Sequence, residues 1–347
     1  MNSSDIAKLA NVSRSTVSRV INNYKNVPES TRRKVQEIID KYGYTPNLSA
    51  RSLAGKANNI IGIFIGDFEK KNSKDSPGDN SPYHAELIIR TVQECKKRKY
   101  MTLVNSISTK KELAQISQYF DNNLIYGGVF IGFPYHMKEL ETLALKNYNV
   151  VLIDQMKFED DKNIQMNLIN SNNFLGGYEI TKYLIENGHK EIAHLEGDNR
   201  LSSFERREGY LSALKDYEIK RKDYLIKCGN FKEEKAYLAT KEILKDNKPT
   251  AIFAANDVMA LGASRAIKEL GLKIPEDISI IGFDNLKFWE TLSFENQEFL
   301  LSLTTMEIDM KDLANKIILS LFSKNKKEHK YCLPRLIKKK TVLKRWI

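Results

Sequence analysis

The chain has 347 residues, of which 41% are hydrophobic and 29% charged, and its formal net charge is +11. This length is enough for two or three compact lobes, and no apolar run reaches the roughly 18 residues of a membrane span. The first residues lack the apolar core of a secretory signal. The three cysteines lie far apart with no C-x-x-C pair, which argues against a disulfide scaffold or a zinc module. We therefore expect a cytoplasmic protein with no membrane span, no metal and no other cofactor.

The positive charge is concentrated near both ends of the sequence. Residues 1–60 carry a surplus of +6 and residues 324–347 a surplus of +9, whereas the residues between them sum to −4. A basic end can bind phosphate, but a charge run is more often a solvated face. Charge alone does not decide between the two.

The first 45 residues predict three short helices. The first begins near Asp5, and the second follows Ser13, a residue well suited to cap it. The third follows Pro28, a weak cap, and ends near Gly43. Apolar residues at helical spacing predict the buried faces, and these are Ile6, Leu9 and Ala10, then Val17, Val20 and Ile21, then Val35, Ile38, Ile39 and Tyr42.

The second helix has a polar, basic outer side. Its side chains are donors of the kind that read base edges and phosphates in the major groove of DNA, and they are Arg14, Ser15, Ser18, Arg19 and Asn22. Two short helices with this outer side indicate a helix-turn-helix. A three-helix cap with a solvated face has the same pattern, so the pattern leaves both interpretations open.

The residues themselves are more specific than the pattern. DIAKLANVSRSTVSRVINN (5–23) and YTPNLSARSLAGK (44–56) resemble the DNA-binding head and hinge of the lactose/galactose repressor (LacI/GalR) family. The resemblance implies that Arg14, Ser15 and Arg19 read bases. It also implies phosphate contacts or assisted readout by Thr16, Ser18 and Asn22.

The resemblance extends to NLSARSL (47–53), which matches the hinge helix that folds in the minor groove of the operator. Asn47 and Ala50 match contact positions there. Leu53 matches the leucine wedge that opens the central base step, which we expect to be CG. A wedge costs a few kcal/mol of unstacking and returns a bent duplex with more contact surface. So short a segment is expected to order only on DNA.

From residue 60 the sequence alternates between apolar runs and helical stretches. Such alternation predicts an α/β fold with parallel sheets covered on both faces. We expect two doubly wound lobes with a ligand cleft at the carboxyl ends of the strands. The predicted strands are 60–66, 101–106, 127–132, 149–154, 191–197, 223–229, 250–255 and 278–284, and the helices include 83–98, 172–187, 231–245 and 257–270.

Residues 172–197 and 255–285 resemble the effector-binding core of the same repressors, which is similar to periplasmic sugar-binding proteins. That likeness implies three crossings between lobes, near residues 157, 288 and 323. The expected domains are a helix-turn-helix domain (1–46), a hinge and linker (47–58), an N-terminal lobe (59–156 and 289–322) and a C-terminal lobe (157–288 and 323–347). The basic tail then contributes strands and solvated lysines to the C-terminal lobe.

Polar residues follow several predicted strands. Asp154, Asn256 and Asp284 stand at strand ends, Arg206 lies in SSFERREGY, and Phe231 is aromatic. All five match effector positions of the family. Carboxylates, an amide and a guanidinium suit vicinal hydroxyls, and an aromatic ring can stack on a sugar. The alternatives stay open: Asp and Asn often cap helices, Arg206 could form a surface ion pair, and Phe231 could be core.

The segment 67–88 is longer and more polar than the family's turn at this place. We expect its insertion, 67–82, to be a surface loop. Phe68, Tyr83 and His84 are candidate cleft contacts.

Other functions remain as alternatives. The nucleotide-binding, metalloprotease and serine-hydrolase motifs are missing, although Asp154 and Asp284 could form a glycosidase pair. A sugar-binding protein, or the same regulator with a purine or phosphoprotein co-repressor, is also open. We expect a homodimeric repressor, not an enzyme, that binds a near-palindromic operator. A sugar-like inducer would release it from carbohydrate-utilisation genes.

Overall fold

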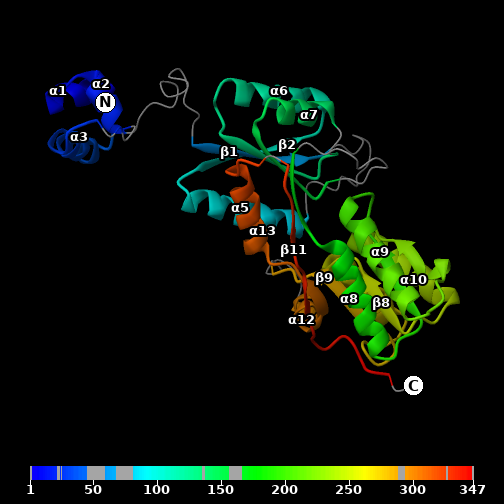
Figure 1. Cartoon of the computed structure of the whole chain (residues 1–347). Helices are drawn as coiled ribbons and strands as arrows, with labels where there is room; N and C mark the ends of the chain where they lie inside the picture. The colour runs from blue at the N-terminus through cyan, green and yellow to red at the C-terminus, as the bar shows by residue number, and fades with distance from the viewer. Residues whose placement is uncertain are drawn as a thin grey trace. The chain divides into compact units, whose positions relative to one another are not determined.

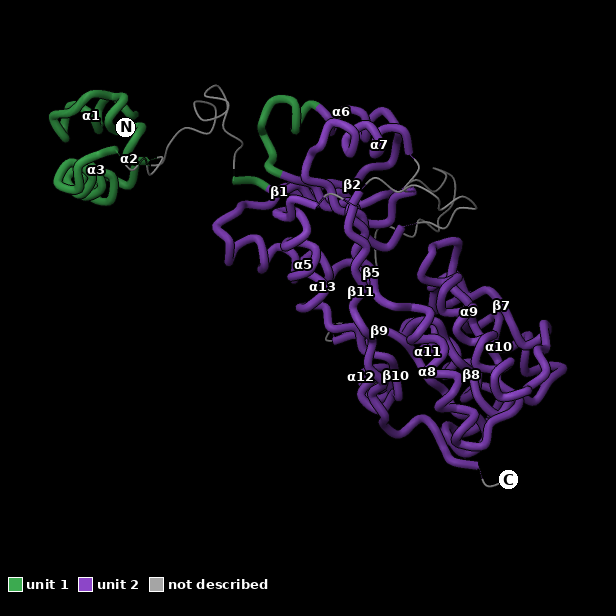
Figure 2. The backbone as a smooth tube through the Cα atoms, in the orientation of Figure 1, with its two compact units in different colours: residues 1–60, 118–126 green, residues 61–117, 127–347 purple. Residues whose placement is uncertain are grey.

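The computed structural model describes residues 2–21, 24, 26–44, 59–67, 81–134, 137–155, 166–287, 294–325 and 327–345. The chain forms two compact units, residues 1–60 with 118–126 and residues 61–117 with 127–347 (Figure 2). The first unit contains a small helical head, and the second contains two parallel sheets with their helices.

The head consists of α1 (Ser3–Ala10), α2 (Arg14–Ile21) and α3 (Glu29–Tyr42) (Figure 1). The three helices enclose a small core to which every helix contributes. Its buried members are Ile6, Ala7, Ala10, Val17, Val20, Val27 and Val35. The predicted three-helix head is therefore confirmed.

The ends of the head helices follow the sequence signals. Ser13 Oγ accepts a hydrogen bond from the backbone N–H of Thr16 (3.1 Å), as expected of an N-cap. Pro28 precedes α3 without a side-chain cap, and Gly43 ends it in the left-handed region (φ 59°). Two predicted core positions are wrong. Leu9 is 47% and Tyr42 46% exposed, because three short helices enclose only a narrow core and leave the edges of each apolar stripe in solvent.

The first sheet has the strand order β11-β5-β4-β3-β1-β2. Its registered neighbours β1–β3, β3–β4, β4–β5 and β5–β11 pair in parallel. Helices α5 (Pro82–Lys97) and α13 (Met310–Leu321) pack against each other beside the sheet, and α7 (Lys138–Leu145) packs on β4. The strands are β1 (Ile60–Gly66), β2 (Met101–Ile107), β3 (Gly127–Ile131), β4 (Asn149–Ile153), β5 (Asn167–Ser171) and β11 (His329–Cys332), and α6 spans Lys110–Asp121.

The second sheet has the order β12-β10-β9-β8-β6-β7. Its registered pairs are parallel except for β12, which runs antiparallel to β10. Helix α8 (Asn173–Glu186) packs on α9 (Leu201–Asp216), and α10 (Glu233–Asp246) packs on α11 (Asp257–Glu269). The remaining elements are β6 (Ile192–Glu196), β7 (Ile226–Cys228), β8 (Ala251–Ala254), β9 (Ser279–Asp284), β10 (Thr304–Glu307), β12 (Arg335–Ile337), α12 (Phe294–Ser302) and the 3-10 turn η1 (Asp223–Leu225). The two doubly wound lobes are as predicted.

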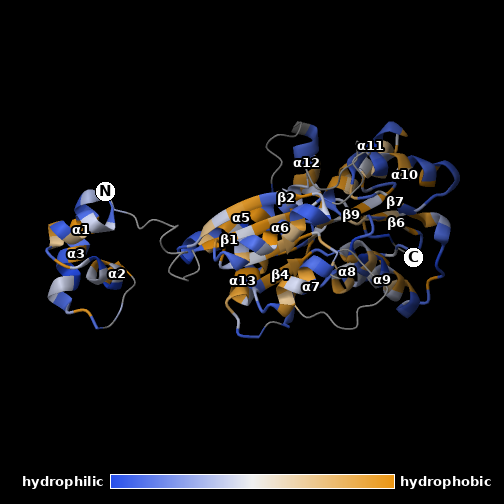
Figure 3. Cartoon of the chain, turned by 90° about the horizontal axis from the view of Figure 1, so that it is seen from above, coloured by the Kyte–Doolittle hydropathy of each residue, from blue (hydrophilic) through white to orange (hydrophobic). Residues whose placement is uncertain are grey.

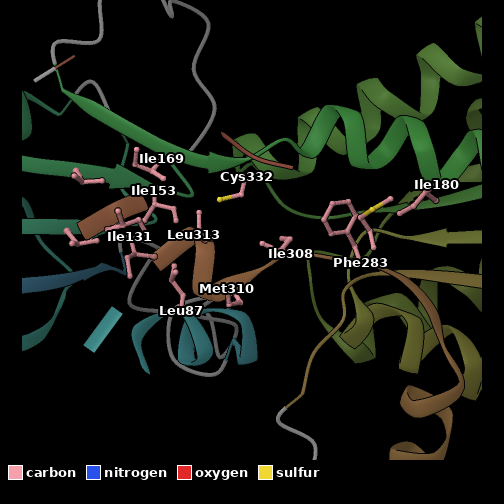
Figure 4. Packing of buried hydrophobic residues seen from close by; sticks show 14 of the residues in the cluster. Leu87, Ile131, Ile153, Ile169, Ile180, Phe283, Ile308, Met310, Leu313 and Cys332 are labelled. Atoms are coloured by element: carbon pink, nitrogen blue, oxygen red, sulfur yellow. The ribbon is translucent and has the colours of Figure 1, made fainter. Parts of the chain in front are cut away.

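Apolar side chains join the two lobes into one body. A buried cluster runs from Ile131 and Ile153, the last residues of β3 and β4 in the first sheet, past Ile308 to Phe283 of β9 in the second (Figure 4). In Figure 3 the hydrophobic colour follows β1, α5 and α13. The central strands β3, β4, β8 and β9 are almost entirely apolar and buried, as expected of parallel strands that are covered on both faces.

The predicted crossings between lobes, and with them the predicted lobe boundaries, are wrong. Residues 157 and 288 lie outside the described residues, but β5 still belongs to the first sheet and β10 to the second. The chain therefore crosses after Ser171, after Glu307 and again between Cys332 and Arg335. Residues 167–171 and 329–332 thus belong to the first lobe and 304–307 to the second. Strand β5 (NLINS) has polar residues at buried positions, so its hydropathy does not reveal it as a strand.

Candidate binding sites

A cavity with a volume of about 30 Å³ lies at the carboxyl ends of strands from both lobes. Asp154, Arg206, Phe231, Asn256 and Asp284 all line it, so the structure brings the five predicted effector residues together. The other lining residues are Ser81, Tyr83, Asn170, Ser171, Asn173, Arg200 and Ser202.

Asp154 connects the two lobes. It follows β4 directly, and His84 Nε2, from α5 of the same lobe, lies 2.9 Å from its Oδ2. From the second lobe, Arg200 Nη1 donates to Oδ2 (3.2 Å) and Ser202 Oγ donates to Oδ1 (3.0 Å). Burial by itself raises the pKa of this carboxyl, but Arg200, His84 and Ser202 outweigh burial and lower the pKa to about 2. Asp154 is therefore a carboxylate at neutral pH.

The pKa of Asp284 is shifted in the opposite direction. It ends β9 with a φ of 105°, and Arg206 Nη2 lies 3.4 Å from its Oδ1. Burial raises the pKa of Asp284 to about 7, although Arg206 lowers it in part. The cavity therefore contains Asp154, which is ionised at neutral pH, and Asp284, which gains or loses its proton near neutral pH.

Arg206 is the most connected cation of the cavity. Its Nε donates to Asn173 Oδ1 (3.0 Å), its Nη1 to the carbonyl of Ala255, and its guanidinium lies 3.6 Å from the centre of the Phe283 ring. Its side chain is 6% exposed, so the surface ion pair considered from the sequence is wrong.

Gly177 allows the backbone of Arg206 to pack closely against α8. A Cβ atom at Gly177 of α8 would lie 2.2 Å from the backbone oxygen of Arg206. The missing side chain lets α8 and α9 approach closely enough to aim the guanidinium inward.

Phe231 lines the cavity, but its face is covered. The guanidinium of Arg200 lies 4.4 Å from the ring centre, which is cation–π distance. The ring also packs against the apolar core of the second lobe. A sugar could stack on this face only after Arg200 moves.

Asn256 caps a helix, which is one of the two roles that the sequence left open, and it also lies in the cavity lining. It caps α11, since its Oδ1 accepts a hydrogen bond from the N–H of Met259 (2.8 Å), and it lines the cavity. Tyr83 also lines the cavity, and burial, followed by the charge of Asp154, raises its pKa well above 10. Phe68, the third candidate of its segment, lies outside the described residues.

Sequence reasoning missed several cavity residues. Arg200 follows β6, so the strand-end rule applied to Asp154 and Asn256 could have found it. Asn170 and Ser171 belong to β5, which the sequence did not reveal as a strand, and Asn173 begins α8 directly after it.

On the head, α2 presents the predicted polar side. Arg14, Ser15, Ser18 and Arg19 are exposed and Thr16 is half-buried, whereas Val17 and Val20 point into the core. Arg14 Nε donates to Ser3 Oγ (2.9 Å), and Ser13 Oγ lies 2.8 Å from Thr16 Oγ1. Asn22, Asn47, Ala50 and Leu53 lie outside the described residues. The described part of the head has the geometry of a helix-turn-helix with a basic recognition surface.

Neither a membrane-spanning helix nor a metal centre is found in the part of the chain that the structure describes. No helix there is long and apolar enough to cross a membrane. No group of three or more His, Cys, Asp or Glu side chains there could hold a metal ion.

Comparison with known proteins identifies the family. The model for bacterial regulatory proteins of the lacI family matches residues 4–47, and the model for a periplasmic binding protein-like domain matches residues 181–342. The HTH-type transcriptional repressor PurR of Histophilus somni (strain 129Pt) is 33% identical over 347 residues, 97% of this chain and 98% of that protein. The chain belongs to the lacI family.

Other lacI-family proteins agree with this placement. The probable HTH-type transcriptional repressor ExuR of Bacillus subtilis (strain 168) is 36% identical over 295 residues, 82% of this chain and 81% of that protein. The Lac repressor dimer bound to operator and the anti-inducer ONPF has the same fold, with a TM-score of 0.76 and 24% identity over 98% of each chain. The complex of the regulator CelR with cellobiose has a TM-score of 0.68 and 21% identity, covering 97% of this chain and 98% of that one.

The two family models match different parts of the chain, and together with the curated relatives they indicate its function. The head contains the match to the lacI-family model, and the match to the periplasmic-binding-protein-like model begins in α8 and covers the rest of the second lobe with α13 and β11 of the first. The curated relatives are transcriptional repressors, and this chain is a DNA-binding transcriptional regulator of the same family.

Proposed function

We propose that this lacI-family regulator represses carbohydrate-utilisation genes and that a sugar or sugar derivative releases it from its operator. The observation that carries the proposal is the interlobe cavity, where Asp154, Asp284, Asn256 and Arg206 converge at strand ends. Carboxylate and amide oxygens accept hydrogen bonds from hydroxyls, and a guanidinium donates to them. Ring hydroxyls of a sugar match that set.

The geometry supports release by a population shift. Arg200 and Ser202 of the second lobe donate hydrogen bonds to Asp154 of the first. The cavity of about 30 Å³ is far smaller than ligand pockets of roughly 300–1,000 Å³. An effector must therefore take over the hydrogen bonds of Asp154 and move Arg200 off Phe231. The lobe arrangement that this favours would be one in which the hinge segment 47–53 no longer folds on DNA.

The DNA side of the proposal rests on the head. Arg14, Ser15 and Arg19 would read bases, with Thr16, Ser18 and Asn22 on phosphates or assisting. The hinge contacts would be Asn47 and Ala50, with Leu53 as the wedge.

We further propose a homodimer on a near-palindromic operator with a central CG step. Strand β2 is one of the two edge strands of the first sheet, and its Met101, Leu103 and Val104 are exposed. An apolar edge strand is a surface for pairing with another chain. A two-fold dimer would present two heads to two half-sites.

The first test is fluorescence anisotropy at physiological salt on a palindromic duplex of about 18 base pairs with a central CG step. Specific recognition should exceed binding to a scrambled duplex by about 10³-fold or more. Leu53→Ala should weaken binding to the palindrome and leave scrambled binding unchanged. Equal loss on both duplexes would refute the wedge. Sugars that lower operator affinity in the same assay would identify the inducer class.

A purine co-repressor is the second candidate, because Tyr83 and Phe231 both line the cavity and a flat base can stack on aromatic rings. A thermal-shift panel of sugars and nucleobases separates the two. A base that raises the melting temperature and strengthens operator binding would replace the sugar proposal.

A further inference from the structure

A second cavity opens on the second lobe, away from the residues discussed so far. It has a volume of about 860 Å³ and lies between α12, the end of α11 with residues 272–276, and residues 339–341. It shares no lining residue with the interlobe cavity. Its volume falls in the range of pockets that hold small molecules, roughly 300–1,000 Å³. We call it the α12 groove.

Part of the lining of the α12 groove is apolar, and we call this part the apolar wall. Leu272, Ile274, Pro275, Phe299 and Leu301 line it. Phe299 is 8% exposed, whereas Leu301 in the last turn of α12 is 61% exposed. Covering such a wall with an apolar body would remove hydrocarbon surface from water.

The same lining also carries lysines. Among the described residues, Lys339 Nζ donates to the neutral oxygens of Asn285 Oδ1 and Leu300, each at 3.3 Å. Burial lowers its pKa, although the charges of Asp257 and Glu307 raise it in part. Lys273 and Lys340 are exposed. Within the described residues, none of these three lysines lies within ion-pair distance of a carboxylate.

The acidic residues of the groove do not cancel this charge. Glu295 forms an ion pair with Lys268, whose Nζ lies 2.7 Å from Glu295 Oε1. That leaves Glu276 and Glu298 against three lysines. A half-buried ammonium without a carboxylate partner is the group that gains most from an added anion.

We propose that the α12 groove is a second ligand site, which takes a small amphipathic anion: an acidic group on an aliphatic or aromatic body. The apolar wall would hold the body, and Lys339 with Lys273 and Lys340 would hold the acid. The site lies close to the first one along the chain, because Lys339 contacts Asn285 and Asn285 follows Asp284.

The test uses the full-length protein and the dye 8-anilinonaphthalene-1-sulfonate, an aromatic anion that fluoresces in apolar surroundings. We expect saturable binding that octanoate displaces and octylamine does not. The double variant Lys273→Gln/Lys340→Gln changes only exposed side chains, and it should weaken dye binding about fivefold or more. Leu301→Asp should weaken it at least as much, since it places a negative charge on the apolar wall.

Matched controls lie elsewhere on the same lobe. Lys190→Gln removes an exposed lysine, and Leu238→Asp changes a leucine on α10 that is 54% exposed. Both should bind the dye as the unchanged protein does. Unchanged affinity in either groove variant, an equal loss in the controls, or displacement by octylamine as well as by octanoate would overturn the proposal.

Discussion

The outer side of α2 and the interlobe cavity are both built from polar and charged residues, but they depend on their surroundings to different degrees. Arg14, Ser15 and Arg19 are exposed, and the hydrogen bonds found for Arg14 and Ser15 stay within the head. In the cavity, Arg206 is buried and bound to Asn173, Ala255 and Asp284. An exposed side chain of α2 can be replaced with little change in the free energy of unfolding. In the cavity, by contrast, Arg206 and its partners fix one another's positions, and their charges act on one another.

The largest expected effect comes from breaking the cavity network. Arg206→Met leaves the partners of a buried guanidinium unsatisfied and should lower the free energy of unfolding by about 3–5 kcal/mol. Urea unfolding measures this. Arg265→Met on the surface of α11, whose side chain is 45% exposed, is the control and should cost about 1 kcal/mol or less. A cost for Arg206→Met no larger than that of the control would contradict the network.

The corresponding change on α2 should affect binding and leave stability alone. Arg19→Ala should weaken operator binding by about 1–3 kcal/mol, roughly ten- to a hundredfold, with an unchanged melting temperature. Anisotropy titration measures the first and calorimetry the second. Arg33→Ala, an 81% exposed position on α3, is the matched control. Equal losses for both variants would mean that α2 contributes only general positive charge.

The two cavity carboxyls should give opposite pH dependences. The pKa of Asp284 is raised to about 7, so the folded protein keeps a proton that the unfolded chain loses near pH 4. The contribution of Asp284 to stability therefore falls as pH rises from about 4 to 7. The pKa of Asp154 is lowered to about 2, so its contribution is present above about pH 4 and is lost as pH falls toward 2.

Replacing Asp284 isolates its part of this dependence. Asp257, whose pKa burial raises to about 6, remains as a background in both proteins. Relative to the unchanged protein, Asp284→Asn should gain on the order of 2 kcal/mol between pH 4.5 and 7.5. Unfolding by urea at the two pH values measures the gain. Parallel pH dependences would show that Asp284 titrates normally.

The smallest expected effect tests whether the N-terminus of α2 depends on its Ser13 cap. Ser13→Ala removes the acceptor for the N–H of Thr16 and should cost about 1 kcal/mol. Amide hydrogen exchange of residues 14–21 should then be about fivefold faster, whereas Ser13→Asp should restore protection. Unchanged exchange in the alanine variant would remove Ser13 from the cap.

Much of the molecule was predictable from local patterns. Helical spacing predicted the three head helices, and strand–helix alternation predicted two doubly wound lobes. The rule that polar residues gather at strand ends found Asp154, Asn256 and Asp284. It was not applied to Arg200, which covers Phe231.

By itself, the sequence predicted the three head helices, strands β1–β4 and β6–β9, and polar side chains at several of their ends, because those properties repeat with the period of the local backbone. Only the tertiary structure decided which sheet each strand joins: β5 and β11 lie in the first sheet and β10 in the second. It also decided that Asp154 is ionised at neutral pH while Asp284 titrates near neutral pH. Strand pairing and the pKa of a buried group depend on neighbours that are distant in the sequence, and no local period records them.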